Sequence, residues 1–243
     1  ESGLRFLPND KSNLAVAAAL AFRRATGQTW KDLRISLTKR IPVCAGTAGG
    51  SSDAAAVLRG LNTLTGAGLS PQALAKIGEE VGSDVPYCVL GGTALAQGRG
   101  ETLSPLPPLP DCFLVLCKPR FSISTPALFR TWDKAKRHLR PDTRGVIAAL
   151  ERGDLVSLAQ RMFNVFEAVL PPHQHRDIEG IKTTLLQAGA LGAAMSGSGP
   201  TVFGLFSQEA AARKAVAVLQ EDYDEVYLTH PLPAHGASCQ IPV

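Results

Sequence analysis

The stretch that decides the fold is IPVCAGTAGGSSDAAAVLRGLN, residues 41–62. A run of small residues at positions 44–52 leads into a segment whose apolar residues recur at helical spacing, namely Ala54, Val57, Leu58, Leu61 and Leu64. The sequence therefore predicts a glycine-rich loop that runs directly into a helix, with serines and Asp53 near the helix start. Such a terminus offers free backbone N–H groups and the positive end of the helix dipole, and glycines let an anion approach the backbone. This is chemistry suited to phosphate.

Two common phosphate-binding motifs do not fit this stretch. No GK[ST] follows the glycines, as a Walker A loop requires, and the G-x-G-x-x-G spacing of a dinucleotide fingerprint is missing. From the residues alone, a tight loop that caps an ordinary helix is an equally good interpretation.

The composition narrows the class of protein. A chain of 243 residues with 45% hydrophobic and 19% charged residues is long enough for one large or two modest soluble domains. The net charge of +4 suits an anionic small molecule, and with 6% aromatic residues there is no basic and aromatic pattern of a nucleic-acid groove. No apolar run approaches 18 residues and there is no signal peptide, so we expect a cytoplasmic protein without a membrane partner. The five cysteines form no C-x-x-C pair, which favours reduced thiols: Cys44, Cys88, Cys112, Cys117 and Cys239.

Periodicity along the chain predicts alternating helices and strands. Helices are expected from residue 14 after Asn13, from residue 71 after Ser70, from Thr125, over 155–169, over 178–185 and over 211–218. Strands are expected over 33–37, 93–96, 112–117 and 226–228, and a strand, glycine turn and strand over 192–206. A proline-rich boundary is expected at 104–110, and His173 and His175 are expected in a polar loop.

Two polar positions have plain structural explanations. Asp84, in the segment GSDVP before Pro86, is an ordinary helix cap by default. Thr125 is likewise a cap, with Phe129 a core aromatic residue one turn later.

Three segments together resemble the GHMP kinases, the family named for galactokinase, homoserine kinase, mevalonate kinase and phosphomevalonate kinase. Residues 42–55 match P-x-x-x-G-x-[AG]-G-[GS]-S-S-[DN]-A-A, the ATP-binding second motif, with Thr47 where the family usually has leucine. Residues 82–86 resemble the segment that carries the catalytic aspartate in one branch, which phosphorylates a cytidine diphosphate-linked polyol on the non-mevalonate route to isoprenoids. Residues 192–206 resemble the third motif.

The resemblance implies an α/β (α+β) chain with the two-domain GHMP kinase fold and its active site between the domains. The first domain, residues 1–110, would bind ATP, resemble domain 2 of ribosomal protein S5 and be incomplete at its start. The second, residues 111–230, would pack helices on an antiparallel sheet, and residues 231–243 would form a tail.

The resemblance also implies roles for particular residues. Asp84 would be the catalytic base and Ser52 a ligand of Mg²⁺. ATP would contact Asn13 and the loop residues Pro42, Val43, Cys44, Ala45, Gly46, Thr47, Ala48, Gly49, Gly50, Ser51 and Ser52. The substrate would contact Thr125, Phe129 and the turn residues Gly197, Ser198 and Gly199, whose backbone faces the phosphates.

One departure leaves alternatives open. The family's first motif, P-x-K-x-N-L, with its catalytic lysine, and an aromatic–histidine pair would both precede Glu1 and are not in the sequence. The sequence therefore predicts an ATP- and Mg²⁺-dependent small-molecule kinase that lacks its first segment. The alternatives are another GHMP kinase such as homoserine kinase, or a non-catalytic ATP-binding relative. No feature indicates an oligomeric state.

Overall fold

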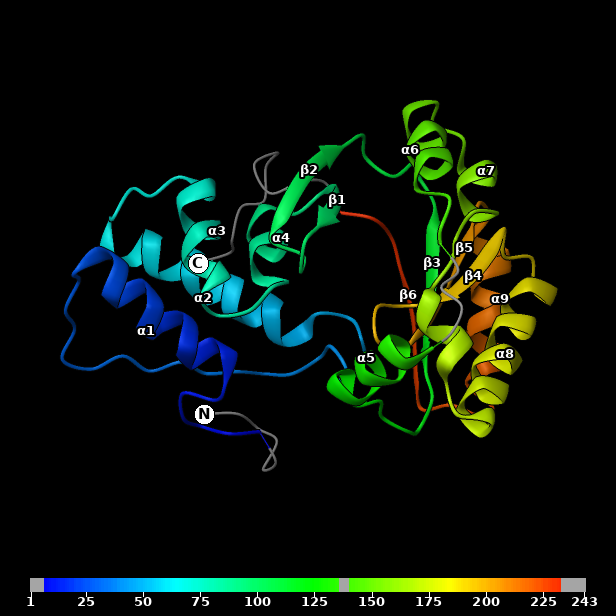
Figure 1. Ribbon diagram of the computed structural model, residues 1–243, viewed down its shortest axis with the longest axis horizontal. Coiled ribbons are helices and arrows are strands. Elements are labelled where there is room, and N and C mark those ends of the chain that lie inside the picture. The colour runs from blue at the N-terminus through cyan, green and yellow to red at the C-terminus, as the bar shows by residue number, and fades with distance from the viewer. Residues whose placement is uncertain (1–6, 136–139, 233–243) are drawn as a thin grey trace. The chain divides into compact units, whose positions relative to one another are not determined.

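A computed structural model describes residues 7–135 and 140–232, and it divides the chain into two compact units (Figure 1). The first unit contains the described residues of Glu1–Val43 and Ala48–Leu106. The second unit contains Cys44–Thr47 and Pro107–Leu232. The first half of the glycine-rich loop therefore packs with the second unit. The expected tail at 231–243 lies outside the described residues from position 233 onward.

The first unit consists of four helices and a two-stranded antiparallel hairpin. Phe22 of α1 and Leu58 of α2 are fully buried in its core, and α2 packs against both α1 and α4 (Figure 1). The elements are α1 (Leu14–Thr26), α2 (Gly49–Thr65), α3 (Pro71–Glu79), α4 (Val85–Leu90), β1 (Thr93–Gln97) and β2 (Thr102–Leu106).

Local sequence signals explain where these helices begin and end. The side chain of Asn13 accepts a hydrogen bond from the N–H of Ala15, and Ser70 does the same for Ala73. Gly27 and Gly66 end α1 and α2 in the left-handed conformation that glycine adopts without strain. The start of α2 differs from expectation, because Ala48 takes the cap position with no side-chain hydrogen bond and Ser51 and Ser52 lie inside the first turn.

One expectation for the first unit is wrong. The segment 33–37 alternates apolar and polar residues, but only Leu37 has an isolated bridge and no strand is assigned. Alternation of apolar and polar residues indicates that one side of a segment is buried, but it does not by itself specify a strand. The division between the two units falls after Leu106, within the expected proline-rich stretch 104–110. The first residues of that stretch also belong to β2, where Ser104 pairs with Leu95 and Pro105 with Ala94.

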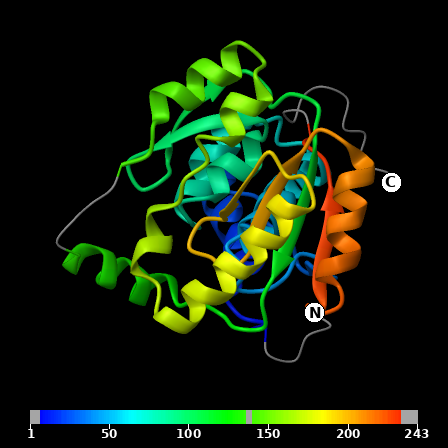
Figure 2. The same ribbon diagram turned by 90° about the vertical axis from the view of Figure 1, so that its right-hand side faces the viewer.

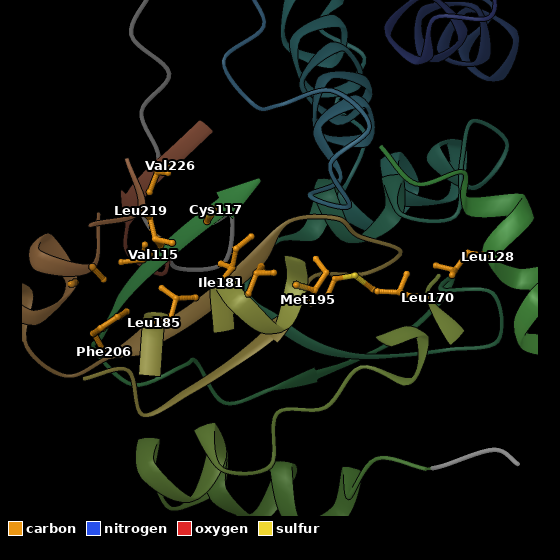
Figure 3. Close-up of a cluster of buried hydrophobic side chains, with 14 residues drawn as sticks. Val115, Cys117, Leu128, Leu170, Ile181, Leu185, Met195, Phe206, Leu219 and Val226 are labelled. Atoms are coloured by element: carbon orange, nitrogen blue, oxygen red, sulfur yellow. The ribbon is translucent and has the colours of Figure 1, made fainter. Parts of the chain in front are cut away.

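The second unit is a four-stranded antiparallel sheet with the order β4-β5-β3-β6. Helices α8 and α9 pack on the sheet and lie in front of the strands in Figure 2. Its core includes Val115 of β3, Phe206 of β5, Ile181 of α8 and Leu219 of α9, and Figure 3 shows this cluster with Met195 in it. The elements are β3 (Phe113–Lys118), α5 (Thr125–Lys134), α6 (Thr143–Glu151), α7 (Leu155–Ala159), the 3₁₀ helix η1 (Val165–Val169), α8 (Pro172–Gln187), β4 (Gly192–Met195), β5 (Val202–Phe206), α9 (Glu209–Leu219) and β6 (Glu225–Thr229). Helices on an antiparallel sheet confirm the expected class of this part of the chain.

The predicted helix over 155–169 is wrong. The chain forms the short helix α7, leaves helical geometry, and resumes as η1 after Asn164, which is extended with φ −123° and ψ 116°. The hydrogen bonds that hold Asn164 are described below. His173 and His175, expected in a loop, lie in the first turns of α8, which begins at Pro172. Helix α6 was not predicted.

Within the described ranges, no helix has both the length and the apolar character needed to span a bilayer.

Candidate active site

The second half of the glycine-rich loop forms the start of α2. Ala48 has φ 51°, a left-handed conformation that is uncommon outside glycine, and α2 begins at the next residue. The N–H groups of the first turn have no acceptor within the helix, so they are available to an outside acceptor. A non-glycine residue held at positive φ is characteristic of functional sites, so this loop start fits an anion-binding role.

The glycines of this turn also serve packing. A Cβ on Gly49 would lie 2.9 Å from Cγ2 of Ile41 and 3.4 Å from Nζ of Lys39, and one on Gly50 would lie 3.2 Å from Cδ1 of Leu14. Bulky side chains at either position would therefore disturb the first unit itself.

The first half of the loop packs against the turn between β4 and β5. Thr201 donates its N–H to the carbonyl of Ala45 over 3.2 Å, and the hydroxyl of Ser196 donates to the carbonyl of Gly46 over 2.9 Å. Gly46 has φ 73°, and a Cβ there would lie 2.8 Å from the nitrogen of Gly199. Two motifs that the sequence separates by about 150 residues are thus in direct contact.

The loop contains an unpaired polar atom. Among the described residues, the hydroxyl of Thr47 is buried without a hydrogen-bond partner. A buried hydroxyl normally has a partner, so an outside acceptor beside Thr47 would remove a cost of roughly 1–3 kcal/mol.

A buried ion pair lies next to the start of α2. Nζ of Lys39 lies 2.5 Å from Oδ2 of Asp53, and the two side chains are 7% and 18% exposed. The pair holds the segment before the loop against the first turns of α2. The ammonium group of Lys39 is therefore engaged with Asp53.

Asp84 is the residue immediately before α4. It occupies the cap position, but its carboxylate makes no capping hydrogen bond to the helix. Val85, directly after it, is fully buried, and α4 is tied to α2 by Arg59, whose guanidinium donates to the carbonyl of Cys88 over 2.8 Å. The backbone around Asp84 is thus held in place. Its side chain is exposed and makes no capping hydrogen bond to α4.

The predicted substrate residues of the second unit lie together. The hydroxyl of Thr125 lies 2.7 Å from the hydroxyl of Ser198, which joins the start of α5 to the turn after β4. One turn further along α5, Phe129 is 49% exposed and contacts Phe166 edge to face, with ring centroids 4.9 Å apart. A large exposed aromatic ring beside two hydroxyl groups fits the recognition of a flat polar ring such as a nucleobase.

Asn13 has a structural role at the start of α1. Its side-chain oxygen accepts from the N–H of Ala15 over 3.0 Å, and its nitrogen donates to the carbonyl of Pro8 over 2.9 Å. Contact with adenine therefore stays a prediction for this residue.

Sequence reasoning missed two residues beside the turn. Asn164 donates to the carbonyls of Met195 and Gly197, and Glu167 accepts from the N–H of Met195. The sequence signal for Asn164 was that asparagine, which is favoured at helix N-caps, stands inside an apolar helical pattern. Such a residue marks a break in the helix.

In the described part of the chain, the thiols form no disulfide. Cys44, Cys88, Cys112 and Cys117 are free. Burial raises the pKa of Cys88 to about 11 and that of Cys117 to about 12, so both are protonated at neutral pH. Cys239 lies outside the described residues. In the described ranges, no group of three or more histidine, cysteine or carboxylate side chains is placed to hold a metal ion.

Comparison with known proteins agrees with this architecture. Residues 13–92 match the GHMP kinases N terminal domain, and residues 146–225 match the GHMP kinases C terminal domain. The chain is 46% identical over 215 residues to the 4-diphosphocytidyl-2-C-methyl-D-erythritol kinase of Lachnoclostridium phytofermentans, covering 88% of this chain and 73% of the relative. It is 45% identical over 229 residues to the enzyme of the same name from Moorella thermoacetica, covering 93% and 79%.

Solved structures show the same fold. A crystal structure of 4-(cytidine 5'-diphospho)-2C-methyl-D-erythritol kinase superimposes with a TM-score of 0.77 at 32% identity, covering 92% of this chain and 80% of that one. The homoserine kinase of Cytophaga hutchinsonii superimposes with a TM-score of 0.75 at 21% identity, covering 96% and 80%, which shows a shared fold alone. Two matched domains and relatives above 40% identity over most of the chain lead to one conclusion: the chain belongs to the GHMP kinase family.

Proposed function

We propose that this kinase transfers the γ-phosphoryl group of ATP to the 2-hydroxyl of 4-diphosphocytidyl-2-C-methyl-D-erythritol. The observation that carries the proposal is the identity of 46% over 88% of the chain to a relative of that name. The grouping of Thr125, Ser198 and the exposed ring of Phe129 supports a cytidine-containing substrate.

The loop 45–52 would hold the phosphates of ATP. Phosphoryl transfer requires mainly positioning and neutralisation of charge. The first turn of α2 supplies N–H donors, and Gly46 and Ala48 supply backbone in the left-handed region. These features fit a polyphosphate group.

A magnesium ion would be held at the same place through the hydroxyl of Ser52, which lies in the first turns of α2. Mg²⁺ is commonly bound by one or two protein oxygens together with phosphates of the substrate, and this chain offers no ready-made cage of carboxylates in its described part. When bound, the ion neutralises charge on the phosphates.

Asp84 would act on the acceptor hydroxyl. A carboxylate held on rigid backbone, without a capping hydrogen bond, is able to orient the hydroxyl and accept its proton. The proton moves from the 2-hydroxyl to a carboxylate oxygen as the oxygen–phosphorus bond forms and ADP leaves.

The test is a kinase assay with two acceptors. The full-length protein is incubated with Mg²⁺-ATP and either 4-diphosphocytidyl-2-C-methyl-D-erythritol or homoserine, and both ADP and the phosphorylated product are measured. We expect product from the cytidyl substrate at a kcat/KM at least a hundredfold above that for homoserine. Equal or greater turnover of homoserine would contradict the proposed substrate.

A further inference from the structure

Asn164 uses its whole side chain to join three segments of the second unit. Its oxygen accepts from the N–H of Phe166 over 2.9 Å, which starts η1. Its nitrogen donates to the carbonyl of Met195 over 2.8 Å and to the carbonyl of Gly197 over 2.7 Å. A carboxamide has two N–H donors and one carbonyl, so each of these groups is in use.

The two carbonyls belong to the turn that contacts the phosphate loop. Met195 ends β4 and Gly197 lies in the turn, while Ser196 between them donates its hydroxyl to the carbonyl of Gly46. A Cβ on Gly197 would lie 3.2 Å from that same carbonyl oxygen. Asn164 therefore holds the turn from one side while Gly46 contacts it from the other.

Glu167 also holds the residue that precedes this turn, Met195. One carboxylate oxygen accepts from the N–H of Met195 over 2.7 Å, and the other lies 2.7 Å from Nζ of Lys182. The side chains of Glu167 and Lys182 are 15% and 18% exposed, and the side chain of Met195 is buried in the core (Figure 3). Both backbone groups of Met195 are thus tied to the segment 164–167, so the turn that follows starts from a fixed point.

From these contacts we infer that Asn164 is a positioning residue for ATP binding. Asn164 holds the turn Gly197–Ser198–Gly199 in place. Ser196 and Thr201, on either side of this turn, then hold the loop segment Cys44–Thr47 through their hydrogen bonds to Gly46 and Ala45. The inference rests on the proposed function only in assigning ATP phosphates to the loop. Asn164 acts through the turn and touches no reacting atom.

The experiment compares two variants of Asn164 by ATP affinity, measured by calorimetric titration. Asn164→Ser keeps a neutral oxygen able to cap η1 but is too short to reach either carbonyl. Asn164→Asp keeps the length and places a charged acceptor against two carbonyl oxygens. We expect each to raise the Kd for ATP about tenfold or more, because a displaced turn moves the backbone of Gly46. Amide hydrogen exchange over 195–201 should rise in both variants.

Asn62 provides a matched control. Its side chain bridges the loop after α2 in a similar way, donating to the carbonyl of Leu69 over 3.0 Å and accepting from its N–H over 2.9 Å. It lies near the far end of α2, about 20 Å along the helix from Gly49. Asn62→Ser should lower the melting temperature to a similar degree as Asn164→Ser and leave the Kd for ATP within twofold.

The outcomes separate this inference from the proposed function. An unchanged Kd in Asn164→Ser, or an equal loss in Asn62→Ser, would overturn the positioning role even if the kinase phosphorylates its substrate. A weakening in Asn164→Asp alone would assign the effect to charge and would also overturn it. If the unsubstituted protein binds ATP but does not phosphorylate the cytidyl substrate, the proposed function fails while the role of Asn164 stands. If it binds no ATP at millimolar concentration, both fail.

Discussion

Asp84 illustrates how a single residue can have two explanations in a sequence. Its position before Val85 and Pro86 predicts a helix cap, and its resemblance to the family's aspartate predicts a base. In the structure it takes the cap position and makes no capping hydrogen bond. Because a capping aspartate stabilises a helix through that bond, stability alone does not account for this carboxylate.

Replacing Asp84 by asparagine tests its role as a base. The amide preserves the shape of the turn but takes no proton, so we expect kcat to fall on the order of 10²–10⁴-fold with the Kd for ATP within about twofold. Steady-state kinetics and ATP titration measure the two effects separately. A variant that turns over within a few-fold of the unsubstituted enzyme would show that Asp84 is structural.

Replacing Gly46 by alanine tests the contact between the glycine-rich loop and the turn between β4 and β5. Gly46 has φ 73°, and in Gly46→Ala the new Cβ would meet both the nitrogen and the oxygen of Gly199 at under 3 Å. The segment would have to shift, so we expect the Kd for ATP to rise tenfold or more.

Gly60→Ala is the matched control. Gly60 lies within α2 with no atom within 4 Å of its added Cβ, so helix propensity should stabilise this variant by about 0.5–1 kcal/mol with ATP binding unchanged. An unchanged Kd in Gly46→Ala would argue against a role for this half of the loop.

At the scale of elements, local signals predict those parts of the fold that depend on neighbouring residues. Asn13, Ser70 and Gly27 mark helix ends because capping involves atoms a few residues apart. At Asn164 the local signal is a single asparagine inside an apolar pattern, and its partners Met195 and Gly197 lie about 30 residues away in sequence, so these contacts could not be predicted in the same way. The apolar residues on both sides of Asn164 fit a helical pattern, and that pattern does not reveal the hydrogen bonds of Asn164 to Met195 and Gly197.

The prediction of a strand over 33–37 was wrong for a related reason. Alternation reports that one side is buried, whereas strand assignment depends on what lies beside it. For the candidate site, the residues themselves predicted the glycine-rich loop at a helix start, whereas the roles of Thr125 and of the turn 197–199 came only from family resemblance. The contact between Thr125 and Ser198 was not predicted. The roles of these residues remain predictions until the variants above are measured.

The junction of η1 with α8 gives a pH-dependent prediction. Burial disfavours the charged form of Lys182, but its hydrogen bonds and attraction to Glu167 and Glu179 outweigh burial, so the pKa of Lys182 lies above its ordinary value. A raised lysine pKa stabilises the fold fully below the unfolded value near 10.4, and the contribution is lost as pH rises through the folded value. Lys182→Met should therefore cost about 2 kcal/mol of unfolding free energy at pH 7, and less above pH 10.5.

Denaturant unfolding at pH 7, 9 and 11 measures this difference. Lys76→Met is the control, because the side chain of Lys76 is 78% exposed in its pair with Glu79 and should matter little at any pH. A cost for Lys182→Met that is independent of pH would contradict this prediction, because methionine keeps an apolar stem of similar length and removes the charge.

At the scale of the whole molecule, the two halves of the glycine-rich loop belong to different units. The segment Cys44–Thr47 groups with the second unit, whereas the residues on both sides of it group with the first. A ligand that binds this loop only in the folded chain should raise the free energy of unfolding.

Thermal unfolding in the presence of nucleotides tests this at the same scale. A ligand that binds only the folded protein at 100 times its Kd adds about 2.7 kcal/mol, which raises Tm by roughly 5–10 °C in a chain of this size. ATP should produce this shift, and AMP, which offers the loop a single phosphate, should produce a much smaller one at equal concentration, because the N–H groups at the start of α2 bind phosphate oxygens. Asp84→Asn should retain the ATP shift and Gly46→Ala should lose most of it. Equal shifts from ATP and AMP would mean that the nucleoside supplies the binding energy and would contradict the assignment of the loop to the phosphates.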